Sequence, residues 1–224
     1  MLYIKFYSSL FTIFSLLNIT IIGMSINPPF YAMQSLLIPF DTVTGDMIIS
    51  HMFLNICLTV GFMTFINKYV DEQFEIMDYV IIRTNAKNML IKYSSYVYKK
   101  MACLLVIKTL SDILFAQTDG LYNVDIFLWL SLSTIITIGI WSELFILLKL
   151  RMLSSKVIYL CLLAILFLAQ LFCHNITISC IVIGSFNLLD QPIIIIGLKT
   201  LLWFTLFTGK LYFFRIYESL GVKE

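Results

Sequence analysis

Residues 126–148 read IFLWLSLSTIITIGIWSELFILL, a run of 23 residues in which Glu143 is the single ionisable side chain. A helix needs about 20 predominantly apolar residues to cross the hydrocarbon core of a lipid bilayer. The run is long enough for one crossing, and it is bounded by Asp125 before it and by Lys149 after it. We therefore predict that it forms a transmembrane helix.

Five further apolar stretches lie on either side of this one. In chain order they cover residues 6–26, 47–66, 101–115, 157–172 and 193–214. Hydrophobic residues make up 60% of the 224 residues and charged residues only 12%, whereas soluble domains contain roughly 45–50% and about 25%. Because a water-soluble fold could not bury so much apolar surface, the sequence predicts one all-α integral membrane domain, residues 1–224, with six transmembrane helices.

The charges that flank these stretches predict the orientation of the chain. Thirteen of the 15 Lys and Arg, Lys210 included, fall on one side of the membrane if the chain crosses it six times. The turns on the other side contain no Lys or Arg, and their charged residues are Asp41, Asp46, Asp119, Asp125 and Asp190. Cytoplasmic loops carry the excess of Lys and Arg, so we expect both termini in the cytoplasm, and the composition favours a bacterial cell membrane. Lys199, inside the sixth stretch, is expected to snorkel to the outer surface.

The segment 67–100 between the second and third stretches is far longer than a turn needs. Its first half has apolar residues at helical spacing and acidic residues on the other face, namely Val70, Phe74, Met77 and Ile81 against Asp71, Glu72, Glu75 and Asp78. Helices that lie on the anionic inner surface of a membrane are normally basic. The acidic face therefore favours docking to a cytoplasmic protein, and the alternative is a solvated face on an interfacial helix.

These features together resemble the permease subunits of ABC-2 type transporters. The resemblance lies in six spans with both ends inside, an amphipathic helix between the second and third spans, and a broken apolar stretch between the last two. The motif that carries it runs from Glu72-Gln73-Phe74-Glu75 to Ile81-Ile82-Arg83-Thr84. The chain is similar to small permeases of Gram-positive peptide export and bacteriocin immunity, including exporters of phenol-soluble modulins.

The resemblance implies a cytosolic coupling helix and a re-entrant helical hairpin over residues 176–190. It implies two protein partners, a cytoplasmic ABC ATPase that binds ATP and Mg and a second permease subunit, identical or related. The residues that it places against the ATPase are Glu72, Phe74, Glu75, Asp78 and Arg83. The implied function is ATP-driven export of a hydrophobic or amphipathic substrate such as a peptide.

Several other functions find no support in the residues. The chain has no GxxxxGK[ST] phosphate-binding loop, no HExxH and no GxSxG, so we expect it to be no enzyme and to carry no cofactor. A net charge of +2 without a basic and aromatic cluster argues against nucleic acid. His51 and His174 do not suggest a metal site, and Cys173 and Cys180 are expected to be apolar thiols rather than a disulfide. The remaining alternative is a stand-alone immunity or scaffold protein of the membrane that has no ATPase partner.

Three ionisable residues inside the predicted spans are candidates for a functional site, because charges within a membrane are expensive and mark pathways. They are Lys108, Asp112 and Glu143. Lys108 and Asp112 lie four residues apart on one helical face and can pair there. Lys108 and Glu143 lie at similar depth, so a bridge between spans is an alternative, and Glu143 can also snorkel to the inner surface.

Overall fold

The structure is a computed structural model that describes residues 2–24, 49–80, 86–116, 124–150, 154–172 and 175–221. All of the regular secondary structure in these residues is helical, which confirms the predicted all-α class for this part of the chain. The long helices are α1 (Leu2–Met24), α3 (Ile49–Val80), α4 (Ala86–Ala116), α5 (Val124–Leu150), α6 (Ser155–Leu171) and α9 (Pro192–Gly221). Two short helices, α7 (Ile176–Ser179) and α8 (Phe186–Asp190), lie between α6 and α9.

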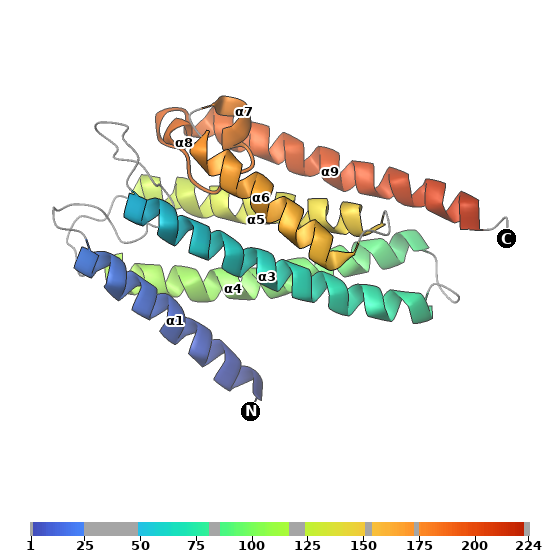
Figure 1. Cartoon of the computed structure of the whole chain (residues 1–224), viewed down its shortest axis with the longest axis horizontal. Coiled ribbons are helices and arrows are strands. Elements are labelled where there is room, and N and C mark those ends of the chain that lie inside the picture. Colours follow the sequence, from blue (N-terminus) through green and yellow to red (C-terminus); the bar gives the residue numbers. More distant parts are fainter. Residues whose placement is uncertain are drawn as a thin grey trace.

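The long helices lie side by side and alternate in direction (Figure 1). Helix α5 is the centre of the bundle, where it packs against α3, α4, α6 and α9, while α1 packs against α4. The end of α3 and the start of α4 lie at one end of the bundle, and α7 and α8 lie at the opposite end (Figure 1). Most side chains of α5 are therefore buried against neighbouring helices, whereas Leu128, Leu132 and Ile135 are exposed.

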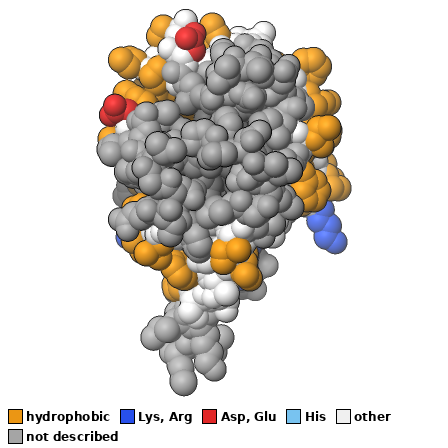
Figure 2. Space-filling model, turned by 90° about the vertical axis from the view of Figure 1, so that its left-hand side faces the viewer, with side chains coloured by type: hydrophobic (Ala, Val, Ile, Leu, Met, Phe, Trp, Pro, Cys, Tyr) orange, Lys and Arg blue, Asp and Glu red, His pale blue; other side chains and the backbone are white. Residues whose placement is uncertain are grey.

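The surface of the bundle is strongly apolar. Helix α9 exposes Ile193, Leu201 and Phe204 by 64–74% of their area, and α6 exposes Leu160 by 65%. Figure 2, which looks onto the end that carries α7 and α8, shows hydrophobic side chains around much of the rim. Monomeric soluble proteins rarely expose apolar surface on this scale, so the outward faces of α6 and α9 support a membrane location.

Two helical segments are long and apolar enough to cross a membrane among the residues described. They are Leu128–Leu150 in α5, which is mostly buried, and Pro192–Tyr212 in α9, which is mostly exposed. Tyr7–Ile19 and Ser155–Leu171 are shorter apolar helices. Helices in four of the six predicted spans thus have the expected apolar character, and two of them reach spanning length.

Helix α3 differs from the prediction because it does not end at residue 66. Its backbone stays helical through all 32 residues from Ile49 to Val80, so the expected separate coupling helix is instead the last part of α3. Residues 62–80 contain neither Pro nor Gly, the two residues that most disrupt a helix interior. Helix α3 is about 48 Å long at 1.5 Å per residue, well beyond the roughly 30 Å hydrocarbon core.

The broken stretch between the last two predicted spans does consist of short helices. Helix α7 has Asn175 as its N-cap, and Ser185 caps α8 by accepting a hydrogen bond from the amide of Leu188. Between them, residues 180–185 are not helical and are largely buried. Helix α8 ends just before Pro192, the first residue of α9, where proline is readily accommodated.

Candidate functional site

The acidic part of α3 faces its own bundle more than the sequence suggested. Phe74 packs against the hydrophobic core, as its spacing predicts, with the ammonium of Lys149 5.9 Å from its ring centre. Asp71 accepts hydrogen bonds from Lys149 Nζ at 2.9 Å and from Ser155 Oγ. This contact ties α3 to the end of α5 and the start of α6.

Glu72 is also engaged within the chain, where it accepts a hydrogen bond from the hydroxyl of Tyr96 on α4 at 3.2 Å. The side chains of Glu75 and Asp78, and the whole of Arg83, lie outside the described residues. The predicted contact of these residues with an ATPase therefore stays a prediction. Two of the four acidic side chains in this part of α3, Asp71 and Glu72, hold neighbouring helices.

Lys108 and Asp112 form an ion pair on α4, which decides between the alternatives left by the sequence. Both side chains are buried, with 3% and 2% of their area exposed. The amide of Asn18 on α1 donates to Asp112 Oδ1 and to Ser111 Oγ, each at 3.1 Å. The two opposite charges are thus paired within α4, and they hold α1 against it.

Glu143 neither bridges to Lys108 nor snorkels to the surface. It is fully buried on α5, and its Oε2 lies 2.5 Å from the ammonium of Lys210, which is also fully buried. The hydroxyl of Tyr98 donates to its other oxygen, and Lys210 also donates to Ser94 Oγ. Lys210, which is one of the charges predicted on the cytoplasmic side, therefore joins α5 to α9 through a buried ion pair.

Lys199 also differs from expectation, because it does not snorkel. Its side chain is fully buried, and its ammonium donates hydrogen bonds to oxygens of α5 and of the segment 180–185. One signal in the sequence points to both buried lysines. Lys199 and Lys210 are 11 residues apart, about three helical turns, so they lie on one face of α9.

Tyr98 and Trp203 connect the Glu143–Lys210 pair to a pocket in the bundle. The indole nitrogen of Trp203 donates to the hydroxyl of Tyr98 at 3.0 Å, and the two rings meet edge to face at 5.9 Å. The indole lies against Gly139 of α5, where an added Cβ would be 3.1 Å from two of its ring atoms. The position of Trp203 therefore depends on the absence of a side chain at residue 139.

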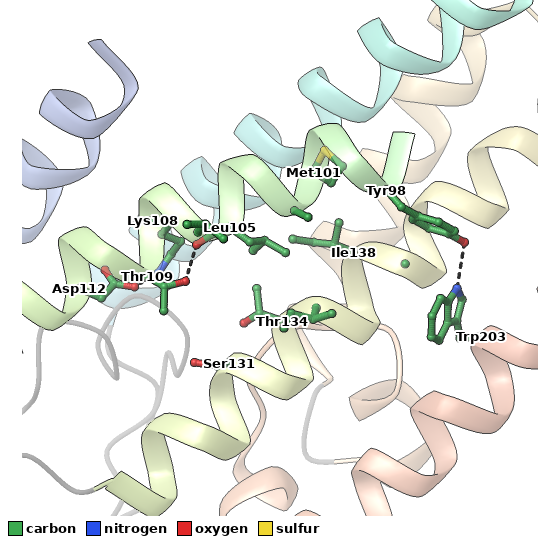
Figure 3. Close-up of a pocket in the computed structure, with 14 residues that line it drawn as sticks. Tyr98, Met101, Leu105, Lys108, Thr109, Asp112, Ser131, Thr134, Ile138 and Trp203 are labelled. Atoms are coloured by element: carbon green, nitrogen blue, oxygen red, sulfur yellow. Dashed lines mark hydrogen bonds and ion pairs between the residues drawn. The ribbon is translucent and has the colours of Figure 1, made fainter. Parts of the chain in front are cut away.

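A cavity of about 380 Å³ lies between α4, α5 and α9. Figure 3 shows Tyr98 and Trp203 at one end, Lys108 and Asp112 at the other, and Ile138 between them. Most of its lining is apolar, and its few polar side chains include the hydroxyls of Thr109, Ser131 and Thr134. This volume is typical of small-molecule pockets, which combine apolar walls with a few polar groups that set orientation.

We expect Gly139→Ala to lower the free energy of unfolding by about 1–2 kcal/mol, because the new methyl group would press on the indole of Trp203. Gly197→Ala on α9 is the matched control, since a Cβ there meets nothing within 4 Å. That control is expected to be neutral or to stabilise by up to about 1 kcal/mol, the helix preference of Ala over Gly. Unfolding in detergent micelles measures both, and equal stability of the two variants would contradict the close approach at Gly139.

Comparisons with protein-family models, with curated proteins and with solved structures find no match to this chain. The candidate site consists of an apolar pocket between α4, α5 and α9, with the Lys108–Asp112 ion pair in its lining at one end. At the other end its lining includes Tyr98, which binds the buried Glu143.

Proposed function

We propose that the chain is the membrane-spanning permease subunit of an ATP-driven exporter in a bacterial cytoplasmic membrane. The observation that carries this proposal is the pocket between α4, α5 and α9, which is lined by the Lys108–Asp112 pair at one end and by Tyr98, the partner of Glu143, at the other. Ionisable residues at membrane depth mark substrate pathways by default. The apolar walls suit a hydrophobic or amphipathic substrate, such as the side chains of a peptide.

The proposed topology has six spans, with both termini and the tip of the α3–α4 hairpin in the cytoplasm. The alternating directions of the long helices support it (Figure 1). The exposed charges also support it, since Lys92 and Lys156 are exposed close to the starts of α4 and α6, and Asp190 is exposed at the end of α8. Residues 176–190 would then form a re-entrant hairpin at the outer face.

The coupling step would start at the acidic end of α3. A cytoplasmic ATPase would contact Glu72, Phe74, Glu75, Asp78 and Arg83, and a second permease subunit would complete the pathway. The contacts of Asp71 with Lys149 and Ser155, and of Glu72 with Tyr96, join this end to α4, α5 and α6. Because α3, α4, α5 and α6 are linked by these contacts, a displacement of the end of α3 would also move α4 and α5, which line the pocket.

The engagement of Asp71 and Glu72 within the chain also favours a second candidate function. A stand-alone immunity or scaffold protein of the membrane would use these acids only to hold its helices together. The two functions differ in one partner, the ATPase. The chain can be purified in mild detergent from cells that express the neighbouring genes. An exporter subunit should then co-purify with a nucleotide-binding protein, and a scaffold should not.

In the exporter, we expect Glu72→Lys/Glu75→Lys to lower recovery of the ATPase by about tenfold or more, because like charges across an interface cost several kcal/mol. Export should fall with it, while insertion into the membrane is unchanged. Quantitative co-purification and a transport assay measure the two effects. Normal recovery and normal export by this variant would remove the coupling role from α3.

Two control variants separate docking from internal packing. Tyr96→Phe removes the hydrogen bond to Glu72 but keeps both acids, so it should retain the ATPase. Asp125→Lys/Asp190→Lys makes the same change of charge at the opposite end of the bundle. It should also retain the ATPase, and loss in this control would show an effect of net charge alone.

A further inference from the structure

The segment 180–185 is an irregular stretch of backbone buried in the bundle. It connects α7 to α8, close to the start of α9 (Figure 1). Val182 and Ile183 are each 2% exposed, so water does not reach this part of the chain. Non-helical backbone is tolerated at membrane depth only where its polar groups find partners within the protein. Its carbonyl oxygens therefore need donors from neighbouring helices.

Three side chains of α5 supply such donors at intervals of one helical turn. The indole of Trp141 donates to the carbonyl of Ile181 at 2.8 Å. Thr137 Oγ1 lies 3.5 Å from the carbonyl oxygen of Val182, and Ser133 Oγ donates to that of Ile183 at 2.6 Å. Residues 133, 137 and 141 thus form one polar face of α5, and the segment follows that face.

The ammonium of Lys199 joins the same contacts from α9. It lies 2.7 Å from Ser133 Oγ and 2.9 Å from Thr137 Oγ1. It lies 2.5 Å and 3.2 Å from the carbonyl oxygens of Val182 and Ile183. We name these four oxygens the oxygen cage. None of them carries a formal charge, and no carboxylate pairs with Lys199 among the described residues.

The oxygen cage has the composition of a site for a small cation. Rings of carbonyl oxygens replace the hydration shell of an ion in selective channels, and here two carbonyls and two hydroxyls surround an ammonium group. The distances of 2.5–3.2 Å fit N–H···O bonds from a charged donor. An ammonium ion can donate to oxygens in several directions, which a neutral side chain of the same length cannot do.

We propose that the oxygen cage is a cation-binding site of the ammonium class and that Lys199 is its built-in occupant. The bound cation joins α5 and α9 to the segment 180–185 and keeps that segment closed over the polar face of α5. When residue 199 has no charge, the segment opens, and a free ammonium or methylammonium ion occupies the cage and closes it again. This role is independent of export and of any ATPase.

Cys180 is a natural reporter of the closed state, because it lies at the start of the segment and is only 8% exposed. Replacing Cys57, Cys103, Cys161 and Cys173 with Ala leaves Cys180 as the single thiol of the full-length chain. The rate of its modification by a water-soluble maleimide in detergent micelles then measures how often the segment opens. The variant that has Cys180 as its single thiol and keeps Lys199 is the reference, in which we expect slow modification of Cys180.

Lys199→Ala removes the ammonium group together with the side chain beyond Cβ, so it leaves room beside the oxygen cage for a free methylammonium ion. We expect this variant to raise the rate of Cys180 modification by about tenfold or more, because several charge-assisted hydrogen bonds are lost. Addition of methylammonium chloride at about 0.1 M should return the rate to near the reference by mass action. Tetramethylammonium chloride at the same concentration has the charge but no N–H donor, so it should not.

Two further variants keep the test decisive. Lys156→Ala removes an exposed lysine and should leave the rate unchanged. Ser133→Ala/Thr137→Val removes two cage oxygens and keeps Lys199, so the rate should rise and methylammonium should not reverse it. This variant stands in if Lys199→Ala does not fold. A reference rate in Lys199→Ala overturns the proposal, and so does a raised rate in Lys199→Ala that both salts, or neither, reverse.

Discussion

Replacing Lys210 with Met is expected to lower the free energy of unfolding by about 3–5 kcal/mol, because it leaves a buried carboxylate with no cation beside it. Glu143 and Lys210 are both fully buried, and their charged groups are 2.5 Å apart. Glu143→Gln should also lower stability, since the ammonium of Lys210 would lose its counter-charge and keep only uncharged partners, namely the new amide oxygen, the Ser94 hydroxyl and the face of the Phe207 ring. Both losses are measured by unfolding the purified chain in mixed detergent micelles.

The double variant Glu143→Gln/Lys210→Met distinguishes a loss of pairing from a loss of packing. It contains no unpaired charge, so we expect it to be less destabilised than either single variant. Lys156→Met, at an exposed lysine, should change stability by less than about 0.5 kcal/mol. If the losses of the two single variants simply add in the double variant, the two charges do not interact.

The second large effect is expected when the cavity is filled. Thr134 lines the cavity from α5 (Figure 3), so Thr134→Phe would place a ring where the substrate is proposed to lie. Export should fall by about tenfold or more, because the pathway is blocked, while the empty volume limits the strain of overpacking. Uptake of a fluorescent amphipathic peptide into inside-out vesicles measures export, and thermal unfolding confirms that the chain is folded.

The control for this variant is Leu132→Phe, which adds a ring to the same helix on an exposed face outside the cavity lining. It should transport the peptide normally. Normal export by a folded Thr134→Phe variant would show that substrate does not pass through the cavity. ATPase recovery should be the same in both variants, because neither residue is near the proposed contact on α3.

Much of the fold could be predicted because the apolar stretches are so distinct. The run 126–148 lies within α5, and 157–172 nearly coincides with Ser155–Leu171. The sequence did not reveal that the helix of the second predicted span continues without a break beyond residue 66. Hydropathy falls where α3 leaves the apolar run, but the helix continues, because polar residues such as Lys68 and Glu72 are good helix formers. Composition locates the apolar part of a helix and not its end.

The candidate site was only partly visible in the sequence. The Lys108–Asp112 pair is local, so spacing alone was enough to propose it. Glu143 and Lys210 are 67 residues apart, and no local pattern joins them. The burial of Lys210 could not be predicted from its charge, because it depends on the packing of α9 on α5, which places the residue opposite a carboxylate. Lys199 was missed in the same way, since its oxygen partners include backbone carbonyls that a sequence cannot show.

The continuity of α3 has a consequence for the direction in which the side chains near its C-terminal end project. In an unbroken helix each residue turns the chain by about 100°, so the azimuth of Glu72 is set by the number of residues between it and the buried Met63 and Ile66. Deletion of one residue before Glu72 would rotate every later side chain about the helix axis by about 100°. Deletion of seven residues would shorten the helix by about 10 Å but would rotate the later side chains by only about 20°. The number of residues in α3 therefore determines the direction in which its last side chains project.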